Sequence, residues 1–244
     1  MNFVFNIDGT LCFNGQTIEE PITTALSTLI QAKHRVTFTS TRPIRDLEPL
    51  IPSALRFCNL IAGNGCFIRQ NNVISVEKLQ EEVVQAIITI VEEEKLTYFA
   101  DGVWNYTFTG EYDHPILKNI NQSTAKNVPL QQLGAISKII LFNPTEKALQ
   151  RLSFLPIVTT YYKNEQALDI RPSRVNKVAG LNVLNIDEYV VFGNDANDQC
   201  MFEHAFFSVC VGDHEVRKYA SLNILKEEVA DTIYFLSQKL ITIH

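Results

Sequence analysis

Four short polar clusters in the sequence carry side chains that could bind a phosphate group beside a hard cation. They are residues 6–10 (NIDGT), 40–42 (STR), 176–177 (NK) and 193–198 (GNDAND). All four directly follow predicted strands. Ligands of open parallel sheets bind at the carboxyl ends of the strands, so three of the clusters are placed to meet there, with Lys177 on the helix beside them. Together they offer backbone N–H groups at a glycine turn, a hydroxyl, a lysine and several side-chain oxygens. We therefore expect them to meet in one crevice.

Each cluster taken alone also has an ordinary structural explanation. Asp8-Gly9-Thr10 is a common turn with a helix-capping residue, and Ser40 could cap the end of a strand. A single Lys177 is typical of a solvated helix face. Residues 194–198 could start a helix, although they contain more side-chain oxygens than capping requires. The functional interpretation therefore depends on the four clusters occurring together.

The composition excludes several classes of protein. With 244 residues, 46% hydrophobic and 20% charged, the chain can form one large domain or two modest ones. Its net charge of −6 is the wrong sign for a protein whose main partner is a nucleic-acid backbone. No apolar stretch approaches the ~20 residues of a membrane span, and the N-terminus lacks a secretory signal pattern. We therefore expect no nucleic-acid or membrane partner and a cytoplasmic location.

The five cysteines do not indicate a structural cross-link. They are odd in number, widely spaced and without the CxxC pattern of many zinc sites. We therefore predict that they are reduced and serve as packing residues. They are Cys12, Cys58, Cys66, Cys200 and Cys210.

Strands alternate with helices at both ends of the chain, which predicts an α/β fold with a parallel sheet and right-handed crossovers. We expect strands at 2–7, 34–40, 57–62, 168–170, 189–192 and 206–211. We expect helices from Glu19, from Pro43, and at 177–184, 198–204 and 226–240.

The alternation is interrupted in the middle of the chain, where an α/β insert of roughly 80 residues with its own antiparallel sheet is predicted. A hairpin at 66–76 precedes it. We expect strands at 97–100, 103–109, 138–142 and 157–162, and helices at 78–94, 114–121 and 145–152. The predicted domains are a core of residues 1–77 and 164–244 and an insert of residues 78–163.

The segments FNIDGTL, FTSTRP, NK and FGNDANDQCMF, in that order and spacing, resemble the four motifs of the haloacid dehalogenase (HAD) superfamily. More narrowly, the chain resembles the Cof-type branch of Mg²⁺-dependent sugar-phosphate phosphatases, which carry an α/β cap between the second and third motifs. The resemblance covers essentially the whole chain, including AGNG at 62–65. It implies a Rossmann-like core with a parallel sheet, and the insert as a cap domain.

The resemblance assigns catalytic roles to four positions. In the family, the first aspartate of the first motif attacks phosphorus, and the second protonates the leaving oxygen and later activates water. These positions are Asn6 and Asp8. Ser40 matches the residue that hydrogen-bonds the phosphoryl group, and Lys177 matches the lysine that neutralises its charge.

Amides replace carboxylates at two positions that the resemblance makes important. Asn6 cannot act as a carboxylate nucleophile, and loss of such a residue normally costs orders of magnitude in rate. The resemblance places Mg²⁺ on Asn6, the Asp8 carbonyl and Asn194, which would bind the ion less tightly than carboxylates. Asp195 or Asp198 could supply charge, and a shift of one residue would let Asp195 substitute directly. The substrate-binding positions implied are Gly9, Thr10, Thr41, Arg42, Asn64 and Asn197, with Thr41 standing where glycine is common.

Two functions remain open at this point. The first is a HAD-type phosphatase for a small phosphomonoester, such as a sugar phosphate, whose nucleophile position is disabled by Asn6. The second is an inactive protein that binds or senses a phosphorylated metabolite. Asn6 is either a trapping substitution of a natural aspartate or natural divergence, and the second amide at Asn194 favours divergence. The sequence leaves the substrate and the oligomeric state undetermined.

Overall fold

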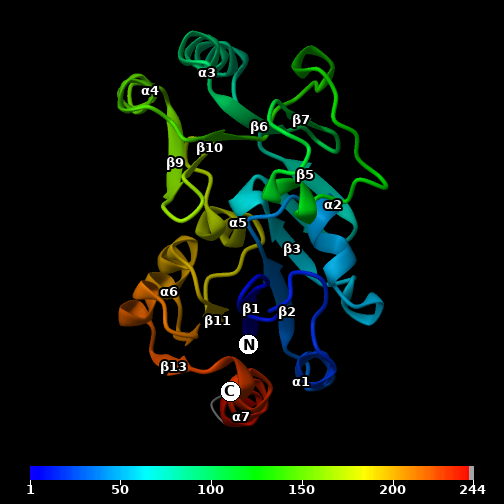
Figure 1. Cartoon of the computed structure of the whole chain (residues 1–244). Coiled ribbons are helices and arrows are strands. Elements are labelled where there is room, and N and C mark those ends of the chain that lie inside the picture. Colours follow the sequence, from blue (N-terminus) through cyan, green and yellow to red (C-terminus); the bar gives the residue numbers. More distant parts are fainter. Residues whose placement is uncertain (242–244) are drawn as a thin grey trace. The chain divides into compact units, whose positions relative to one another are not determined.

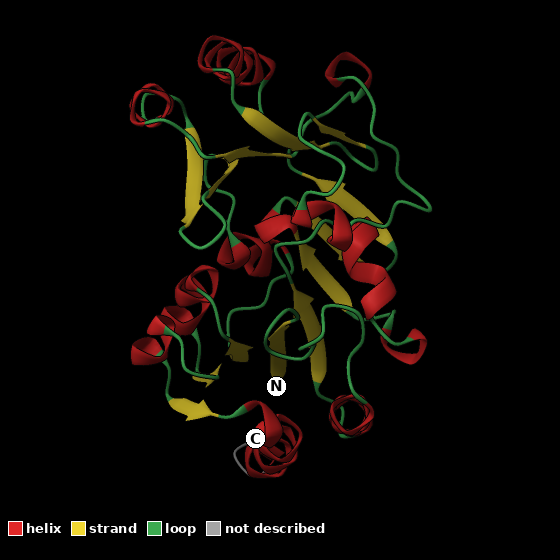
Figure 2. Cartoon of the chain, in the orientation of Figure 1, coloured by secondary structure: helices red, strands yellow, loops and turns green. Residues whose placement is uncertain are grey.

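The structure is a computed structural model that describes residues 1–241. The chain divides into two compact units, Met1–Ile74 with Lys177–His244, and Ser75–Asn176. Each unit combines a β-sheet with helices (Figure 2). The core unit is therefore built from both ends of the chain, with the second unit inserted between them.

The core unit contains an eight-stranded sheet in the order β13-β12-β11-β1-β2-β3-β4-β5. The six strands from β13 to β3 are parallel to their neighbours, and β4 is antiparallel to β3. This confirms the predicted parallel sheet. The strands are β1 (Asn2–Asn6), β2 (Arg35–Thr39), β3 (Asn59–Ala62), β4 (Phe67–Gln70), β5 (Val73–Val76), β11 (Tyr189–Gly193), β12 (Phe207–Val211) and β13 (Leu222–Ile224).

Both faces of the central strand β1 are buried, as expected for a parallel sheet covered by helices on two sides. Phe3, Val4 and Phe5 are all fully buried. Val4 belongs to the apolar cluster formed with α5 and α6 on one face of the sheet. Phe5, the next residue, points to the opposite face and packs against Phe192 of β11.

Helices cover the core sheet. α5 (Lys177–Val183) and α6 (Gln199–His204) pack against the face that contains Val4. α1 (Glu20–Gln31) and α7 (Val229–Ile241) lie side by side (Figure 1). The apolar residues of α1 recur at helical spacing and are buried, which explains why this segment was recognisable as a helix. A single turn, α2 (Ile44–Leu47), follows Pro43.

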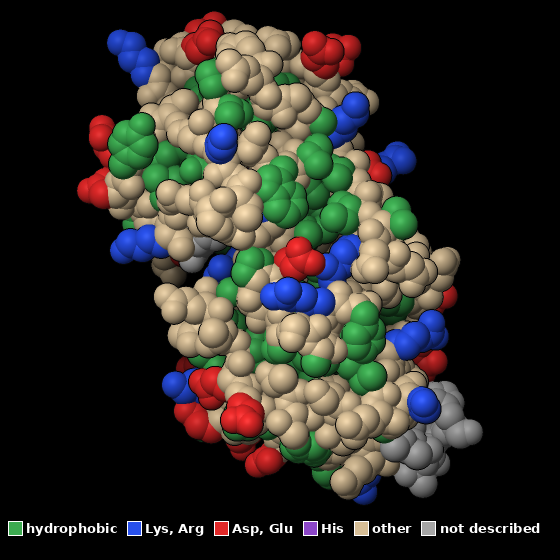
Figure 3. Space-filling model, turned by 90° about the vertical axis from the view of Figure 1, so that its right-hand side faces the viewer, with side chains coloured by type: hydrophobic (Ala, Val, Ile, Leu, Met, Phe, Trp, Pro, Cys, Tyr) green, Lys and Arg blue, Asp and Glu red, His purple; other side chains and the backbone are tan. Residues whose placement is uncertain are grey.

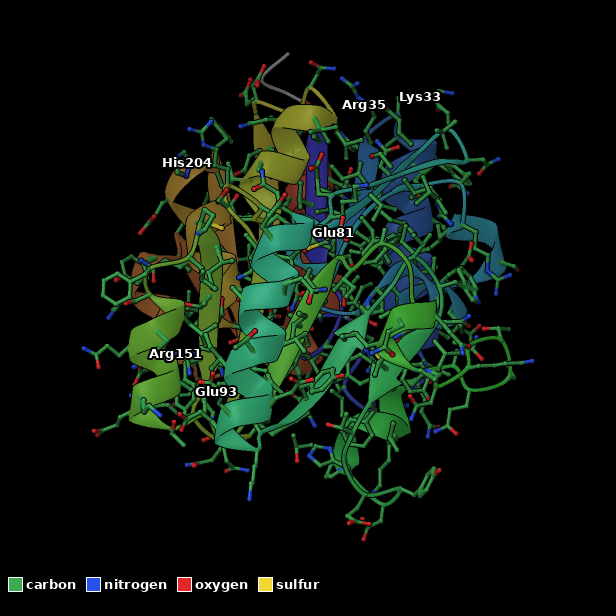
Figure 4. All side chains as sticks on the ribbon, turned by 90° about the horizontal axis from the view of Figure 1, so that it is seen from above. Lys33, Arg35, Glu81, Glu93, Arg151 and His204 are labelled. Atoms are coloured by element: carbon green, nitrogen blue, oxygen red, sulfur yellow. The ribbon has the colours of Figure 1, made fainter. Side chains whose placement is uncertain are left out.

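The inserted unit contains a five-stranded antiparallel sheet in the order β7-β6-β8-β10-β9. Its helices α3 (Glu81–Glu94) and α4 (Glu146–Leu152) share one apolar cluster with the sheet. Arg151 of α4 forms an ion pair with Glu93 of α3 (Figure 4). The strands are β6 (Thr97–Asp101), β7 (Tyr106–Phe108), β8 (Lys138–Phe142), β9 (Ile157–Tyr162) and β10 (Ala167–Pro172).

The prediction that residues 168–170 return to the core sheet is wrong. They belong to β10, which pairs with β8 and β9 in the sheet of the insert. Leu168 and Ile170 pack beneath α3 and α4, while Asp169 on the other face forms ion pairs with Lys138 and Arg171. The chain enters the core unit again at Lys177, so the units divide at 176/177 and not at 163/164.

Smaller differences between the predicted and the observed elements lie at turns. The helix expected at 114–121 is a 3₁₀ segment, Pro115–Asn119, and the strand expected at 103–109 shortens to β7. A turn closed by the Gly102 N–H and the Asn105 carbonyl separates β6 from β7, which removes residues 103–105 from the strand. β13 was not predicted from the sequence.

The cysteines agree with the expectation from the sequence. All five cysteines are free, and four of them are buried. Acidic and basic side chains are interspersed on the face drawn in Figure 3. None of the helices within the described residues combines the length and apolarity needed to cross a bilayer.

The close approach of α5 to β3 can be tested at Gly180. A Cβ at this position would lie 2.6 Å from Cγ2 of Ile61, a stiff and fully buried side chain. Alanine normally stabilises a helix interior by about 1 kcal/mol relative to glycine, whereas overpacking costs about 1–3 kcal/mol. We expect Gly180→Ala to lower the free energy of unfolding in urea. The exposed control Asn182→Ala on the same helix should be neutral or stabilising. Equal gains in both variants would contradict this packing.

Candidate active site

The four polar clusters meet at the carboxyl edge of the core sheet, as predicted. β1 ends at Asn6, β2 is followed by Ser40, and β11 ends at Gly193. These three strands are neighbours in the sheet. α5 begins at Lys177, whose side chain reaches Asn6.

Asn6 is the centre of a hydrogen-bond network. Its Nδ2 donates to the carbonyl oxygen of Asp8 and to Oδ1 of Asn194, both at 2.9 Å. Its Oδ1 accepts from Nζ of Lys177 at 3.1 Å. The Asn194 oxygen also accepts from the Thr10 hydroxyl at 2.8 Å. The side-chain amide of Asn6 therefore connects the first, third and fourth motifs.

Lys177 and Asp198 form an ion pair that is shielded from water. The distance from Nζ to Oδ1 is 2.6 Å, and the two side chains are 1% and 0% exposed. The second oxygen of Asp198 accepts from the backbone N–H groups of Asn194 and Asp195. Satisfying both oxygens in this way offsets much of the cost of burying a carboxylate.

Asp8 faces Arg42 and Ser40. The Arg42 guanidinium donates to both carboxylate oxygens, at 3.0 and 2.6 Å, and the Ser40 hydroxyl lies 3.4 Å from Oδ2. The Ser40 hydroxyl also accepts from the backbone N–H of Arg42 at 3.0 Å. In this arrangement Arg42 holds the Asp8 side chain in place, and its contact with a phosphate stays a prediction.

Gly9 permits the close approach of the first and fourth motifs. Its φ of +72° lies in the left-handed region, and a Cβ there would be 2.3 Å from Nδ2 of Asn194. Gly193 plays a similar part, since a Cβ would lie 2.7 Å from the Asp198 side chain. Neither position can take a larger residue without moving a side chain of the network.

The remaining predicted positions surround this network. The Asn64 N–H donates to the Ser40 carbonyl, and its backbone adopts a left-handed φ of 56°. Thr41 is half-buried between Ser40 and Arg42. Asn197 donates to Asp195 at 3.2 Å, and Asp195 caps the turn that follows it. Roles of these residues in substrate binding stay predictions.

Sequence reasoning missed the contribution of the loop after the first motif. The Gly15 carbonyl accepts from Nη2 of Arg42 at 3.3 Å, so it helps to orient the guanidinium toward Asp8. The dipeptide Asn14-Gly15 is a turn signal that could have marked this loop.

The residues around Asn6 do not fit a magnesium ion. Mg²⁺ favours oxygen ligands, most of all carboxylates, whereas both side-chain positions implied by the resemblance are neutral amides. Asn6 moreover directs an N–H donor at the two other oxygens of the set. Asp198 is engaged by Lys177 and Asp195 by the backbone N–H of Ala196. Within the described residues, no group of three or more His, Cys, Asp or Glu side chains is arranged to hold a metal.

Thiols lie close to the buried ion pair. The pKa of Cys210 is raised to about 11, chiefly by burial and in smaller part by the nearby Asp198 carboxylate. Burial also raises the pKa of Cys200, an effect that nearby Lys177 opposes. These thiols therefore stay protonated at neutral pH and act as apolar packing beside the network.

Comparison with known proteins identifies relatives along the whole chain. The family model described as haloacid dehalogenase-like hydrolase matches residues 3–234. A Mycoplasma genitalium protein, named as a candidate phosphatase, is 25% identical over 275 residues, covering 98% of this chain and 97% of its own.

Solved structures share the fold. A haloacid dehalogenase-like hydrolase from Bacteroides thetaiotaomicron is 21% identical with a TM-score of 0.79, covering 96% of this chain and 98% of its own. A structure described as a HAD subclass IIB sugar phosphatase is 17% identical with a TM-score of 0.74, covering 100% and 99%. The chain thus has the Rossmann-like fold of these hydrolases.

The buried ion pair should matter far more to stability than an exposed one. Removing one partner of a buried pair costs about 3–5 kcal/mol because the other charge is left uncompensated. We expect Lys177→Ala to destabilise by that amount in urea unfolding, and the added change Asp198→Asn to recover part of the loss. The control is Arg217→Ala, which breaks an exposed ion pair with Asp213 and should cost less than about 1 kcal/mol. Similar losses for both single variants would contradict this assignment.

The close contact between position 9 and the Asn194 side chain can be tested by comparing two glycines with the same backbone conformation. Gly9 and Gly15 both have φ +72°, but a Cβ at Gly15 would meet only Nη2 of Arg42, at 3.5 Å. Alanine in the left-handed region costs about 1–2 kcal/mol at either position. We expect Gly9→Ala to lose at least ~1 kcal/mol more than Gly15→Ala, because Asn194 must also move. Equal thermal or urea stability of the two variants would refute the close contact.

Proposed function

The chain belongs to the haloacid dehalogenase-like hydrolase family, and from that premise we propose that it carries the site of a sugar-phosphate phosphatase in a form blocked at the nucleophile. Its ligand is a small phosphomonoester, and a sugar phosphate is the class we favour. A relative in the fold comparison is described as a sugar phosphatase. We further propose that the inserted unit is the cap expected from its position in the chain.

The observation that carries this proposal is the convergence of the family's reactive positions. Lys177 reaches Asn6, Asn6 contacts Asp8, and Ser40 lies beside the Asp8 carboxylate. A lysine, a hydroxyl and a carboxylate around one strand end suit the binding of a phosphoryl group and the transfer of a proton. The sequence separation of these residues makes their meeting a specific result of the fold.

A carboxylate at position 6 would complete the chemistry. One of its oxygens would attack phosphorus and form an acyl phosphate as the bond to the leaving oxygen breaks. Protonated Asp8 would donate its proton to that oxygen. The Asp8 carboxylate would then take a proton from water as the water attacks phosphorus, which releases inorganic phosphate and regenerates the carboxylate at position 6.

The carboxamide of Asn6 stops this sequence at its first step. Its oxygen is a neutral, delocalised acceptor that already receives a hydrogen bond from Lys177. We therefore propose that the chain as it stands binds its phosphorylated ligand without turning it over at an appreciable rate.

A second candidate function is a binding or regulatory protein for a phosphorylated metabolite. The observation that favours it is the fit between the two amides, since Asn6 and Asn194 form a direct hydrogen bond at 2.9 Å. A single trapping substitution would not account for the amide at Asn194. Under this candidate, ligand affinity is the function and turnover is absent.

Restoring the carboxylates separates the two candidates. We expect the unchanged chain to show no turnover of p-nitrophenyl phosphate or a panel of sugar phosphates. Asn6→Asp, alone or with Asn194→Asp, should raise kcat by at least a hundredfold, on the order of 3 kcal/mol in barrier height. The assay contains Mg²⁺, because the superfamily generally uses this ion.

The control variant is Asn182→Asp, which adds one negative charge at an exposed position of α5 and should leave turnover at background. If both restored variants fold but hydrolyse nothing, the phosphatase proposal fails. Sugar-phosphate binding by the unchanged chain, measured calorimetrically, would then support the second candidate. The absence of both binding and turnover would contradict both.

A further inference from the structure

The Asn6 side chain occupies the middle of a set of oxygen atoms. The Asp8 carbonyl and Asn194 Oδ1 both lie 2.9 Å from its Nδ2. These are the same two oxygens that the sequence resemblance assigns to the metal ion, together with the side-chain oxygen at position 6. The Asn6 amide therefore uses the would-be metal ligands as hydrogen-bond acceptors.

The orientation of the Asn6 amide is determined by its neighbours. A lysine ammonium can only donate, so the atom facing Lys177 must be Oδ1. A backbone carbonyl can only accept, so the atom facing Asp8 must be Nδ2. The reversed amide would set Nδ2 against the ammonium and three oxygens against one another, which loses all three hydrogen bonds of the Asn6 side chain.

Asn194 is oriented by the same reasoning. Its Oδ1 accepts both from Asn6 and from the Thr10 hydroxyl, at 2.9 and 2.8 Å. A carboxylate at position 6 alone would put two acceptors into this contact, which now has one donor and one acceptor. A carboxylate at position 194 would keep the accepting oxygen. The pairing of the two side chains therefore depends on the Asn6 amide as its donor.

Charge gives an independent argument for this pairing. Exchanging two aspartates for asparagines removes two negative charges, and omitting one divalent cation removes two positive charges. The net charge of the site is then unchanged, so no cation is required for neutrality. The nearby carboxylates of Asp8 and Asp198 already have partners in Arg42 and Lys177.

We propose that the Asn6 carboxamide has replaced the divalent cation in this chain, so that its N–H donors perform the structural task of the ion and exclude it. A cation could reach the Asp8 carbonyl and Asn194 only by breaking two hydrogen bonds and meeting a neutral donor set. It follows that a phosphorylated ligand binds with the same affinity with or without divalent ions. This last consequence rests on the proposed function, whereas the exclusion of the cation does not.

The first experiment is calorimetric titration of MgCl₂ into the whole chain and into the double variant Asn6→Asp, Asn194→Asp. We expect no binding heat for the unchanged chain up to 10 mM Mg²⁺ and at least tenfold tighter binding by the double variant. The charge-matched control Asn182→Asp, Asn185→Asp adds the same two charges at exposed positions and should behave like the unchanged chain. Thermal melting with EDTA or Mg²⁺ gives a second readout, in which only the double variant should gain a higher Tm with Mg²⁺.

Saturable Mg²⁺ binding by the unchanged chain, lost in Asn6→Ala, would overturn the inference. The melting comparison on the unchanged chain decides the matter even if the double variant fails to fold: a Tm raised by Mg²⁺ contradicts the inference, and an unchanged Tm supports it.

Inorganic phosphate is then titrated in EDTA and in Mg²⁺. Equal affinity for phosphate in EDTA and in Mg²⁺ supports the inference, and phosphate binding that occurs only in Mg²⁺ overturns it. If phosphate binds in neither, the proposed function fails while the Mg²⁺ titration still decides the inference.

Discussion

The carboxylate of Asp198 is the group on which the arrangement of the site depends. It is fully buried, and it accepts hydrogen bonds from Lys177 and from the backbone of Asn194 and Asp195. One side chain thereby fixes both the loop after β11 and the start of α5. Because a buried charge is tolerated only with all its partners in place, the geometry of these segments is set as a unit.

Hydrogen bonds of two neutral amides connect the first motif to this buried ion pair. Asn6 connects Lys177 to Asn194, and Gly9 leaves the space that Asn194 requires. On the other side, Arg42 and Ser40 hold Asp8. The site thus consists of two ion pairs, Asp8 with Arg42 and Lys177 with Asp198, linked by the hydrogen bonds of the Asn6 amide. A preorganised framework of this kind lowers the cost of rearrangement that ligand binding would otherwise carry.

The sequence was sufficient to predict that these clusters meet, because parallel strands bring their carboxyl ends to one edge of the sheet. It also gave the positions of the helices whose apolar residues recur at regular spacing, such as α1. It could not assign β10 to a sheet, since a short apolar run fits either one. The pairing of Arg42 with Asp8 and the direction of the Asn6 amide were equally out of reach, because they depend on which side chains meet across the folded chain. Catalytic and binding roles stay predictions.

The connectivity of the network also has a bearing on how the protein folds. Asn6 and Asn194 are separated by 188 positions in the sequence, and Asn6 and Lys177 by 171. Contacts of such long range form late, since the entropy of closing the intervening loop must be overcome first. During synthesis, Asn6 must wait for the whole insert and for β11 before both Lys177 and Asn194 are available as partners. The contacts of Asn6 with Lys177 and Asn194 therefore form late, and chains that end before residue 198 lack the buried carboxylate that anchors them.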